Sequence, residues 1–173
     1  VPVLTELLVP LDGSSLADAA IAHAAEIARR IHGSLHLVRV HVPVATISSP
    51  PEAAIFIPDP AWDERLRADA EAWITRRGEA LRTTLGVPVT AEFRVGSAVD
   101  EIVDAATERR SRAIVCSTHG LGGWAPHWLG SIADGLIRHA PCPVFAMSEA
   151  AVARPASVRR LLVLLDGSSV SAA

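Results

Sequence analysis

A glycine-containing loop followed by a helix is the part of the sequence best suited to bind phosphate. Ser117-Thr118-His119-Gly120 follows a short apolar run, and nine residues separate Gly120 from Gly130-Ser131, where a helix is predicted to begin. Glycine lets backbone N–H groups approach an anion without a Cβ in the way, and the first N–H groups of a helix attract negative charge. No lysine lies in the loop, so it is not a Walker-type loop. These residues alone fit either a phosphate-binding loop or a glycine turn with a serine cap.

A single carboxylate, Asp12, is expected in the same region. It directly follows the apolar run Leu7 to Leu11 and precedes Gly13-Ser14. An aspartate in this position either contacts a ligand or accepts hydrogen bonds within its own turn or at the start of the next helix. Both interpretations remain open at this point.

The sequence predicts no catalytic residue and no metal site. His119 is a candidate general base, but no nucleophile with a third orienting group accompanies it, and Ser117 lies in the same loop without a triad pattern. A role for His119 in shaping the loop is therefore favoured. The other histidines are scattered without ligand spacing. Cys116 and Cys142 are predicted to be buried structural thiols.

Apolar runs alternate with amphipathic stretches along the chain, and this order predicts the fold class. Such alternation is typical of an α/β protein with an open, doubly wound parallel sheet, here five-stranded, and helices on both faces. The predicted strands are Leu7 to Leu11, Leu35 to Val42, Val87 to Val95, Ala113 to Ser117 and Val144 to Met147, and the predicted helices are Leu16 to Ile31, Asp63 to Leu85, Val99 to Arg110 and Ser131 to His139.

The strand order decides whether the candidate residues meet. In open sheets of this class, ligands bind beyond the carboxyl ends of the strands, where the strand order reverses. The first and fourth predicted strands end in the polar or glycine-containing segments at Asp12 and Ser117. If these strands are neighbours at the reversal, both segments face one crevice.

A repeat near the end of the chain suggests a tandem protein. Residues 7–15, LLVPLDGSS, recur at 161–169 as LLVLLDGSS, with eight of nine positions identical. The offset of 154 residues is the length of a domain. We therefore predict a domain over residues 1–149, a linker over 150–158, and over 159–173 the first strand and loop of a second copy that breaks off.

Composition excludes several classes of function. The net charge of −3 shows no basic excess, which argues against a nucleic-acid partner. No run approaches the roughly 18 apolar residues of a membrane span, and the start lacks the pattern of a secretory signal. We expect a soluble, cytoplasmic protein without a membrane partner.

Four tryptophans need an explanation of their own. Trp62 and Trp73 fall in or next to the long second helix, where burial in the core is expected. Trp124 and Trp128, four residues apart, fit a lid over the ligand, a contact with a partner subunit, or packing of their loop on the sheet.

Four segments, in this order and spacing, resemble the universal stress protein family over nearly the whole of residues 5–148. They are Leu8-Val9-Pro10-Leu11-Asp12-Gly13-Ser14, Ser117-Thr118-His119-Gly120, Leu129-Gly130-Ser131-Ile132-Ala133 and Arg138-His139-Ala140-Pro141-Cys142-Pro143-Val144. The resemblance implies the adenine-nucleotide alpha hydrolase-like fold and a nucleotide-responsive role in stress adaptation, with little or no catalysis.

The resemblance also implies a binding site. The nucleotide-binding branch of the family carries Gly, two residues, Gly, nine residues, Gly and then Ser or Thr. Gly120, Gly130 and Ser131 match this motif, but Ser117 stands in place of its first glycine. The serine either obstructs the ligand or supplies a hydrogen bond. The implied site residues are Pro10, Asp12, Val40, Ser117, His119, Gly120, Gly130, Ser131 and Ile132, with Asp12 and the backbone of Val40 on the adenine and ribose side.

The implied ligand is ATP or a related adenine nucleotide, with Mg²⁺ as its companion. The alternative is a protein-interaction domain of the same fold that Ser117 has deprived of its ligand. Members of the family pair their last strand with that of a partner. Val144 to Met147 would accordingly join a second subunit or the second tandem copy.

Overall fold

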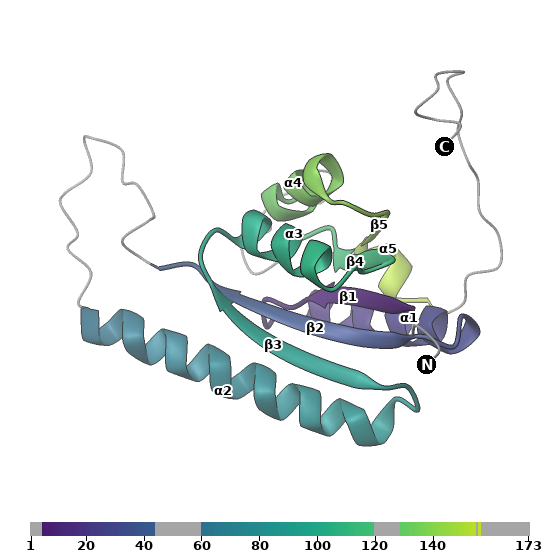
Figure 1. The fold of residues 1–173 in the computed structure, drawn as a ribbon, viewed down its shortest axis with the longest axis horizontal. Coiled ribbons are helices and arrows are strands. Elements are labelled where there is room, and N and C mark those ends of the chain that lie inside the picture. Colours follow the sequence, from purple (N-terminus) through teal and green to yellow (C-terminus); the bar gives the residue numbers. More distant parts are fainter. Residues whose placement is uncertain (1–4, 44–59, 120–128, 155, 157–173) are drawn as a thin grey trace.

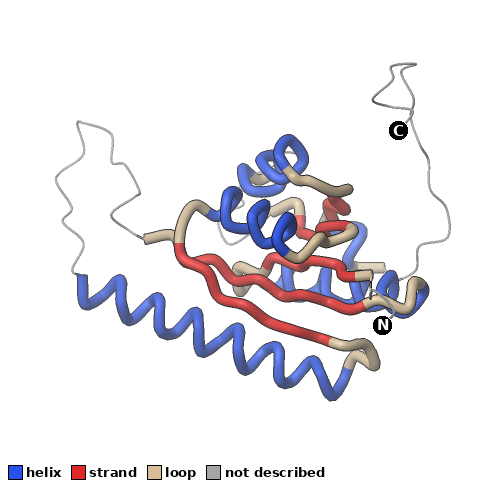
Figure 2. Tube along the Cα trace, in the orientation of Figure 1, coloured by secondary structure: helices blue, strands red, loops and turns tan. Residues whose placement is uncertain are grey.

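The computed structural model describes residues 5–43, 60–119, 129–154 and 156 (Figures 1 and 2). All nine predicted elements are present in the predicted order, and three have the predicted bounds. The strands are β1 (Glu6–Pro10), β2 (Ser34–His41), β3 (Val89–Val95), β4 (Ala113–Ser117) and β5 (Val144–Met147). The helices are α1 (Ser15–Arg30), α2 (Pro60–Thr84), α3 (Ala98–Glu108), α4 (Ser131–His139) and a short α5 (Glu149–Val152).

The five strands form one parallel sheet in the order β3-β2-β1-β4-β5. Helices α1 and α2 pack on one face of the sheet, and α3 and α4 on the other (Figure 1). The chain moves outward from β1 through β2 to β3, then returns to β4 on the other side of β1. The strand order therefore reverses between β1 and β4, which confirms the predicted fold class and makes the first and fourth strands neighbours.

Two apolar layers hold the helices to the sheet. Residues Leu7 and Val9 of β1 face α1 and α2, whereas Leu8 faces α3 and α4. A strand that is buried on both faces needs such a continuous apolar run. Small side chains bring α1 close to the sheet, since Ala24 and Ala28 are fully buried in the first layer.

Helix α1 has a defined cap at each end. Ser14 Oγ accepts a hydrogen bond from the Ala17 N–H at 3.1 Å. At the other end His32 has a φ of +51°, and the next N–H, that of Gly33, donates to the carbonyl of Ala28 at 2.8 Å. This is the arrangement that commonly ends a helix, although glycine is the usual residue at the position of His32.

A buried histidine links β2 to β3. His36 is 1% exposed, and its ring nitrogens lie 2.7 Å from Thr90 Oγ1 and 2.9 Å from Glu92 Oε2. Because a carboxylate only accepts, Nε2 carries the proton and Thr90 donates to Nδ1 when the ring is neutral. Burial, assisted by the charge of Arg109, lowers the pKa of His36.

One of the two tryptophans of the second helix differs from its prediction. Trp62 is 42% exposed rather than buried, because it lies in the first turn of α2, whereas Trp73 packs against the core as expected. The short helix α5, whose first turn is capped by Ser148, overlaps the first residues of the segment 150–158, whose role as a linker stays a prediction. Several predictions fall outside the described residues. They concern residues 155, 157 and 158 of the predicted linker, the repeat at 161–169, Trp124 and Trp128.

Candidate functional site

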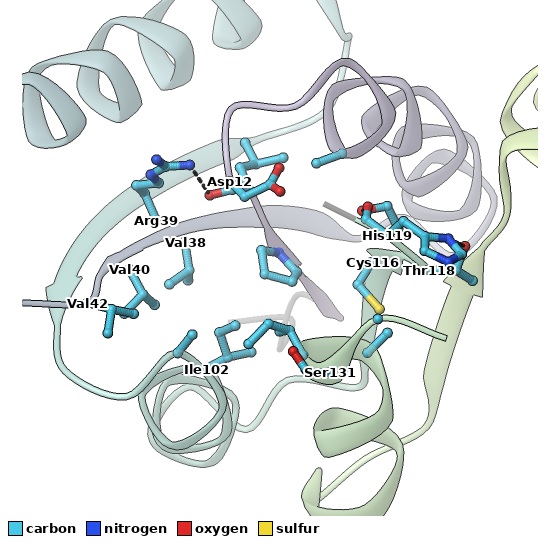
Figure 3. A pocket seen from close by; sticks show the side chains of 18 residues that line it. Asp12, Val38, Arg39, Val40, Val42, Ile102, Cys116, Thr118, His119 and Ser131 are labelled. Atoms are coloured by element: carbon cyan, nitrogen blue, oxygen red, sulfur yellow. Dashed lines mark hydrogen bonds between the residues drawn. The ribbon is translucent and has the colours of Figure 1, made fainter. Parts of the chain in front are cut away.

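A cavity of about 450 Å³ opens beyond the carboxyl ends of β1 and β4, at the reversal of the strand order (Figure 3). Pockets for small ligands and cofactors typically have this size and position. Eight of the nine predicted site residues line it, namely Pro10, Asp12, Val40, Ser117, His119, Gly130, Ser131 and Ile132. The ninth, Gly120, lies outside the described residues.

The floor and one wall of the cavity are apolar. Val38 and Val40 come from β2, Ile102 from α3 and Cys116 from β4 (Figure 3). Burial raises the pKa of the Cys116 thiol to about 11, so this group is a neutral part of the floor at physiological pH. Such a surface suits a flat, weakly polar group like a nucleobase.

The N-terminus of α4 supplies hydrogen-bond donors at another side of the cavity. In the described part of the chain no side chain caps this helix, whose N-cap residue is Gly130. The first N–H groups of a helix have no partner within the helix, and here they belong to the lining residues Ser131 and Ile132. Together with the helix dipole, they favour an anion.

Gly130 lets α4 start directly against the end of β4. Its N–H donates to the carbonyl of Thr118 at 2.7 Å. A Cβ on Gly130 would lie only 2.9 Å from that same carbonyl oxygen. The φ of −61° is open to any residue, so glycine is needed here for the close approach.

The hydroxyl of Ser117 bonds within its own loop. Ser117 Oγ donates to the backbone carbonyl of His119 at 2.7 Å, and Thr118 Oγ1 lies 3.0 Å from His119 Nδ1. Both side chains thereby hold the backbone that leaves β4. Within the described ranges no hydrogen bond joins Ser117 to the His119 ring, whose buried Nε2 has no partner there.

Asp12 has a structural contact and also faces the cavity. Its Oδ1 accepts a hydrogen bond from the Ser14 N–H at 2.9 Å, which closes the turn between β1 and α1. The residue also lines the cavity (Figure 3). The two roles considered for Asp12 are therefore compatible, because the turn itself places the carboxylate at the site.

Sequence reasoning missed Arg39, which also lines the cavity. Its Nη1 donates to the carbonyl of Leu11 at 3.3 Å, and its guanidinium lies 5.7 Å from the centroid of the Trp73 ring. Burial lowers the pKa of Arg39, and the charge of Asp12 acts in the opposite direction. The signal in the sequence was an arginine in the otherwise apolar run Leu37 to Val40.

Residues 5–147 match the Universal stress protein family. The chain belongs to this family. A universal stress protein of Thermus aquaticus is 32% identical over 139 residues, which cover 80% of this chain and 94% of that protein. The solved structure of the universal stress protein UspA from Lactobacillus plantarum is 26% identical, covers 82% of this chain and 96% of its own, and has a TM-score of 0.64.

Two further solved structures of universal stress proteins hold adenine nucleotides. One, from Archaeoglobus fulgidus, is in complex with dAMP; it is 20% identical, covers 83% of this chain and 96% of its own, and has a TM-score of 0.54. The other is in complex with cAMP, is 21% identical, covers 82% of this chain and 94% of its own, and has a TM-score of 0.55. At these identities the likeness establishes a shared fold.

The described residues contain neither a metal-binding cluster nor a membrane-spanning helix. No group of three or more histidine, cysteine or carboxylate side chains there could hold a metal ion. No helix in the same part of the chain is both long and apolar enough to cross a membrane.

Proposed function

We propose that the protein is a nucleotide-binding regulatory module of the stress response, with ATP or a related adenine nucleotide in the cavity. The observation that carries this proposal is the convergence of an uncapped helix start, an apolar floor and the Asp12 carboxylate on one cavity at the strand reversal. The relatives in complex with dAMP and cAMP support the choice of an adenine nucleotide.

Each part of the nucleotide has a matching part of the cavity. The phosphates would bind the backbone N–H groups at Ser131 and Ile132, with the Ser131 hydroxyl beside them. The base would lie against Val38 and Val40, and the ribose hydroxyls would donate to Asp12. These assignments pair each of the three chemical groups with protein groups of the matching donor, acceptor or apolar type.

Mg²⁺ would be held mainly by the nucleotide. Asp12 is the one carboxylate among the described lining residues, and Mg²⁺ commonly keeps several waters while binding one carboxylate and substrate phosphates. We further propose that the module regulates through occupancy and that any ATP hydrolysis is slow.

The alternative proposal is a protein-interaction domain without a ligand, and Ser117 is the residue on which it depends. If the serine Cβ and hydroxyl obstruct the phosphate path, replacement by glycine should restore binding. The hydrogen bond to the His119 carbonyl favours tolerance, because it occupies the hydroxyl within the loop.

Calorimetric titration of ATP with Mg²⁺ tests the proposal on three proteins: the parent, Ser117→Gly, and Ser148→Gly as a matched control outside the cavity lining. Saturable binding by the parent and the control supports a nucleotide module. Binding by Ser117→Gly alone means that the serine blocks an otherwise intact site. No binding by any of the three would favour the interaction domain.

We also propose that the protein associates through β5. This strand forms one edge of the described sheet, and Val144 to Met147 are apolar and only half-buried. An uncovered apolar edge invites pairing, either with a second subunit or with the second tandem copy. Light scattering after size exclusion should give the mass of a dimer at micromolar concentration, whereas a monomer would contradict this proposal.

We also propose that the protein is cytoplasmic, with neither nucleic acid nor a membrane as a partner. The net charge of −3 supports the first exclusion. Filter binding to DNA and co-sedimentation with anionic vesicles should both give no retention above a bovine albumin control.

A further inference from the structure

Arg39 is the one arginine or lysine among the described residues that line the cavity. It lies on β2, on the face of the sheet that α1 and α2 cover, since its neighbours Leu37 and Val38 point to the first and second apolar layers respectively. Its guanidinium lies beside the turn that follows β1, near Asp12 (Figure 3).

Two contacts fix the Arg39 side chain. Nη1 donates to the carbonyl of Leu11, the residue before Asp12. On the other side the guanidinium lies over the ring of Trp73 from α2, a geometry that favours a cation. Arg39 thus spans the space between α2 and the turn that carries Asp12.

The guanidinium lies next to the turn that carries Asp12. Gly13 has a φ of +84°, and a Cβ added there would lie 3.5 Å from Arg39 Nη1. The turn is also closed from within by the bond from the Ser14 N–H to Asp12 Oδ1. Arg39 thus contacts the Asp12 turn through the Leu11 carbonyl and also lines the cavity.

The charge of Arg39 matters because of Asp12. A carboxylate in a partly buried cavity repels a phosphate, and the effective dielectric constant near such a site makes this repulsion stronger than in water. Arg39 remains ionised despite its burial, since a guanidinium does not lose its proton in proteins. The cation beside Asp12 offsets the repulsion that a phosphate would otherwise meet.

We propose that Arg39 is a positioning and selectivity residue of the nucleotide site: it holds the Asp12 turn and offsets the Asp12 charge, so that the cavity takes nucleoside phosphates in preference to the neutral nucleoside. This inference rests on the proposed nucleotide function. It assigns the preference for an anionic ligand partly to β2 and α2, elements remote from the phosphate loop.

The test compares AMP with adenosine, because the two ligands share base and ribose and differ in charge. Dissociation constants for both are measured by calorimetry at low salt for the parent and for Arg39→Gln and Arg39→Lys. Glutamine removes the charge and ends at the position of the arginine Nε, whereas lysine keeps the charge and loses the planar group. Arg76→Gln is the matched control, since Arg76 is an exposed arginine on α2 outside the lining.

We expect Arg39→Gln to weaken AMP about tenfold while adenosine changes less than about threefold; tenfold corresponds to about 1.4 kcal/mol. Arg39→Lys should keep the parent ratio of the two constants, and so should the control. Adding Asp12→Asn to Arg39→Gln should bring the ratio back toward the parent value, because the uncompensated charge is then gone.

The outcomes separate the two proposals. If the parent binds neither ligand, the proposed function fails and the inference fails with it. If the parent binds AMP but Arg39→Gln weakens AMP and adenosine by the same factor, Arg39 only supports the fold and the inference alone is overturned. A ratio that Asp12→Asn does not restore would also overturn it.

Discussion

Replacing Gly130 by serine sets two local effects against each other. Serine is a better N-cap residue than glycine by a few tenths of a kcal/mol, and α4 has no side-chain cap among the described residues. N-cap preference alone therefore predicts a small gain in stability. The structure predicts a loss, because any Cβ at this position would lie 2.9 Å from the carbonyl oxygen of Thr118.

The loss can be estimated from the contact. Carbon and oxygen atoms prefer separations near 3.5 Å, so the end of β4 or the start of α4 must move by several tenths of an ångström. That movement strains the 2.7 Å hydrogen bond from the Gly130 N–H to Thr118. Overpacking of this kind costs about 1–3 kcal/mol, and after the gain from the cap we expect a net loss of about 1–2 kcal/mol.

Urea unfolding followed by far-UV circular dichroism measures this loss in free energy. In thermal unfolding followed by the same signal, the melting temperature should fall by about 3–6 °C. Ser14→Gly is the matched control at the N-cap of α1, where the hydroxyl accepts from Ala17; it should cost only a few tenths of a kcal/mol. Serine would thus be the better cap at α1 and the worse one at α4. A Gly130→Ser protein as stable as the parent, or more stable, would refute the close approach as the reason for glycine.

Three other predictions concern the rest of the fold. Burial lowers the pKa of His36, so the contribution of this residue to stability is complete above the unfolded pKa of about 6.5. It is lost as the pH falls from there through the pKa of the folded state. Between pH 7.5 and 5.5 the urea midpoint of the parent should therefore drop more than that of His36→Gln, and equal drops would contradict this. His32→Gly should raise the free energy of unfolding by about 1 kcal/mol, because His32 has a φ of +51°. Gly33→Ala should lower it by more than 2 kcal/mol, since the alanine Cβ would lie 2.2 Å from the Thr5 carbonyl oxygen. The same urea assay compares the two variants. Cys142, which is half-buried, should react with a thiol reagent at pH 8 well before Cys116, which is buried and has a pKa of about 11. Mass spectrometry of the labelled peptides measures the order, and labelling of Cys116 first would contradict this prediction.

The sequence determined the order and type of the five strands and of the four helices that cover the sheet. The signals are local: continuous apolar runs for strands buried on both faces, Ser14 before α1, and Gly130 before α4. Bounds agreed within three residues at each end. Because strand order in a doubly wound sheet follows from a few topological rules, the position of the cavity could also be predicted.

The tertiary structure decided the contacts between residues far apart in the chain. Arg39 meets Trp73 only because α2 packs across β2, and nothing in the spacing of these residues indicates it. The prediction that Trp62 is buried was wrong for a related reason, since this residue lies in the first turn of α2 and is exposed to solvent.

The partner of the Ser117 hydroxyl also depended on the tertiary structure. Whether the serine obstructs a ligand or gives it a hydrogen bond stays a prediction, but the backbone path after β4 places the hydroxyl against the His119 carbonyl. Periodicity and capping depend on a residue's own neighbours, so the sequence contains them; the partner of a hydroxyl or a guanidinium depends on where the folded chain returns, which only packing determines.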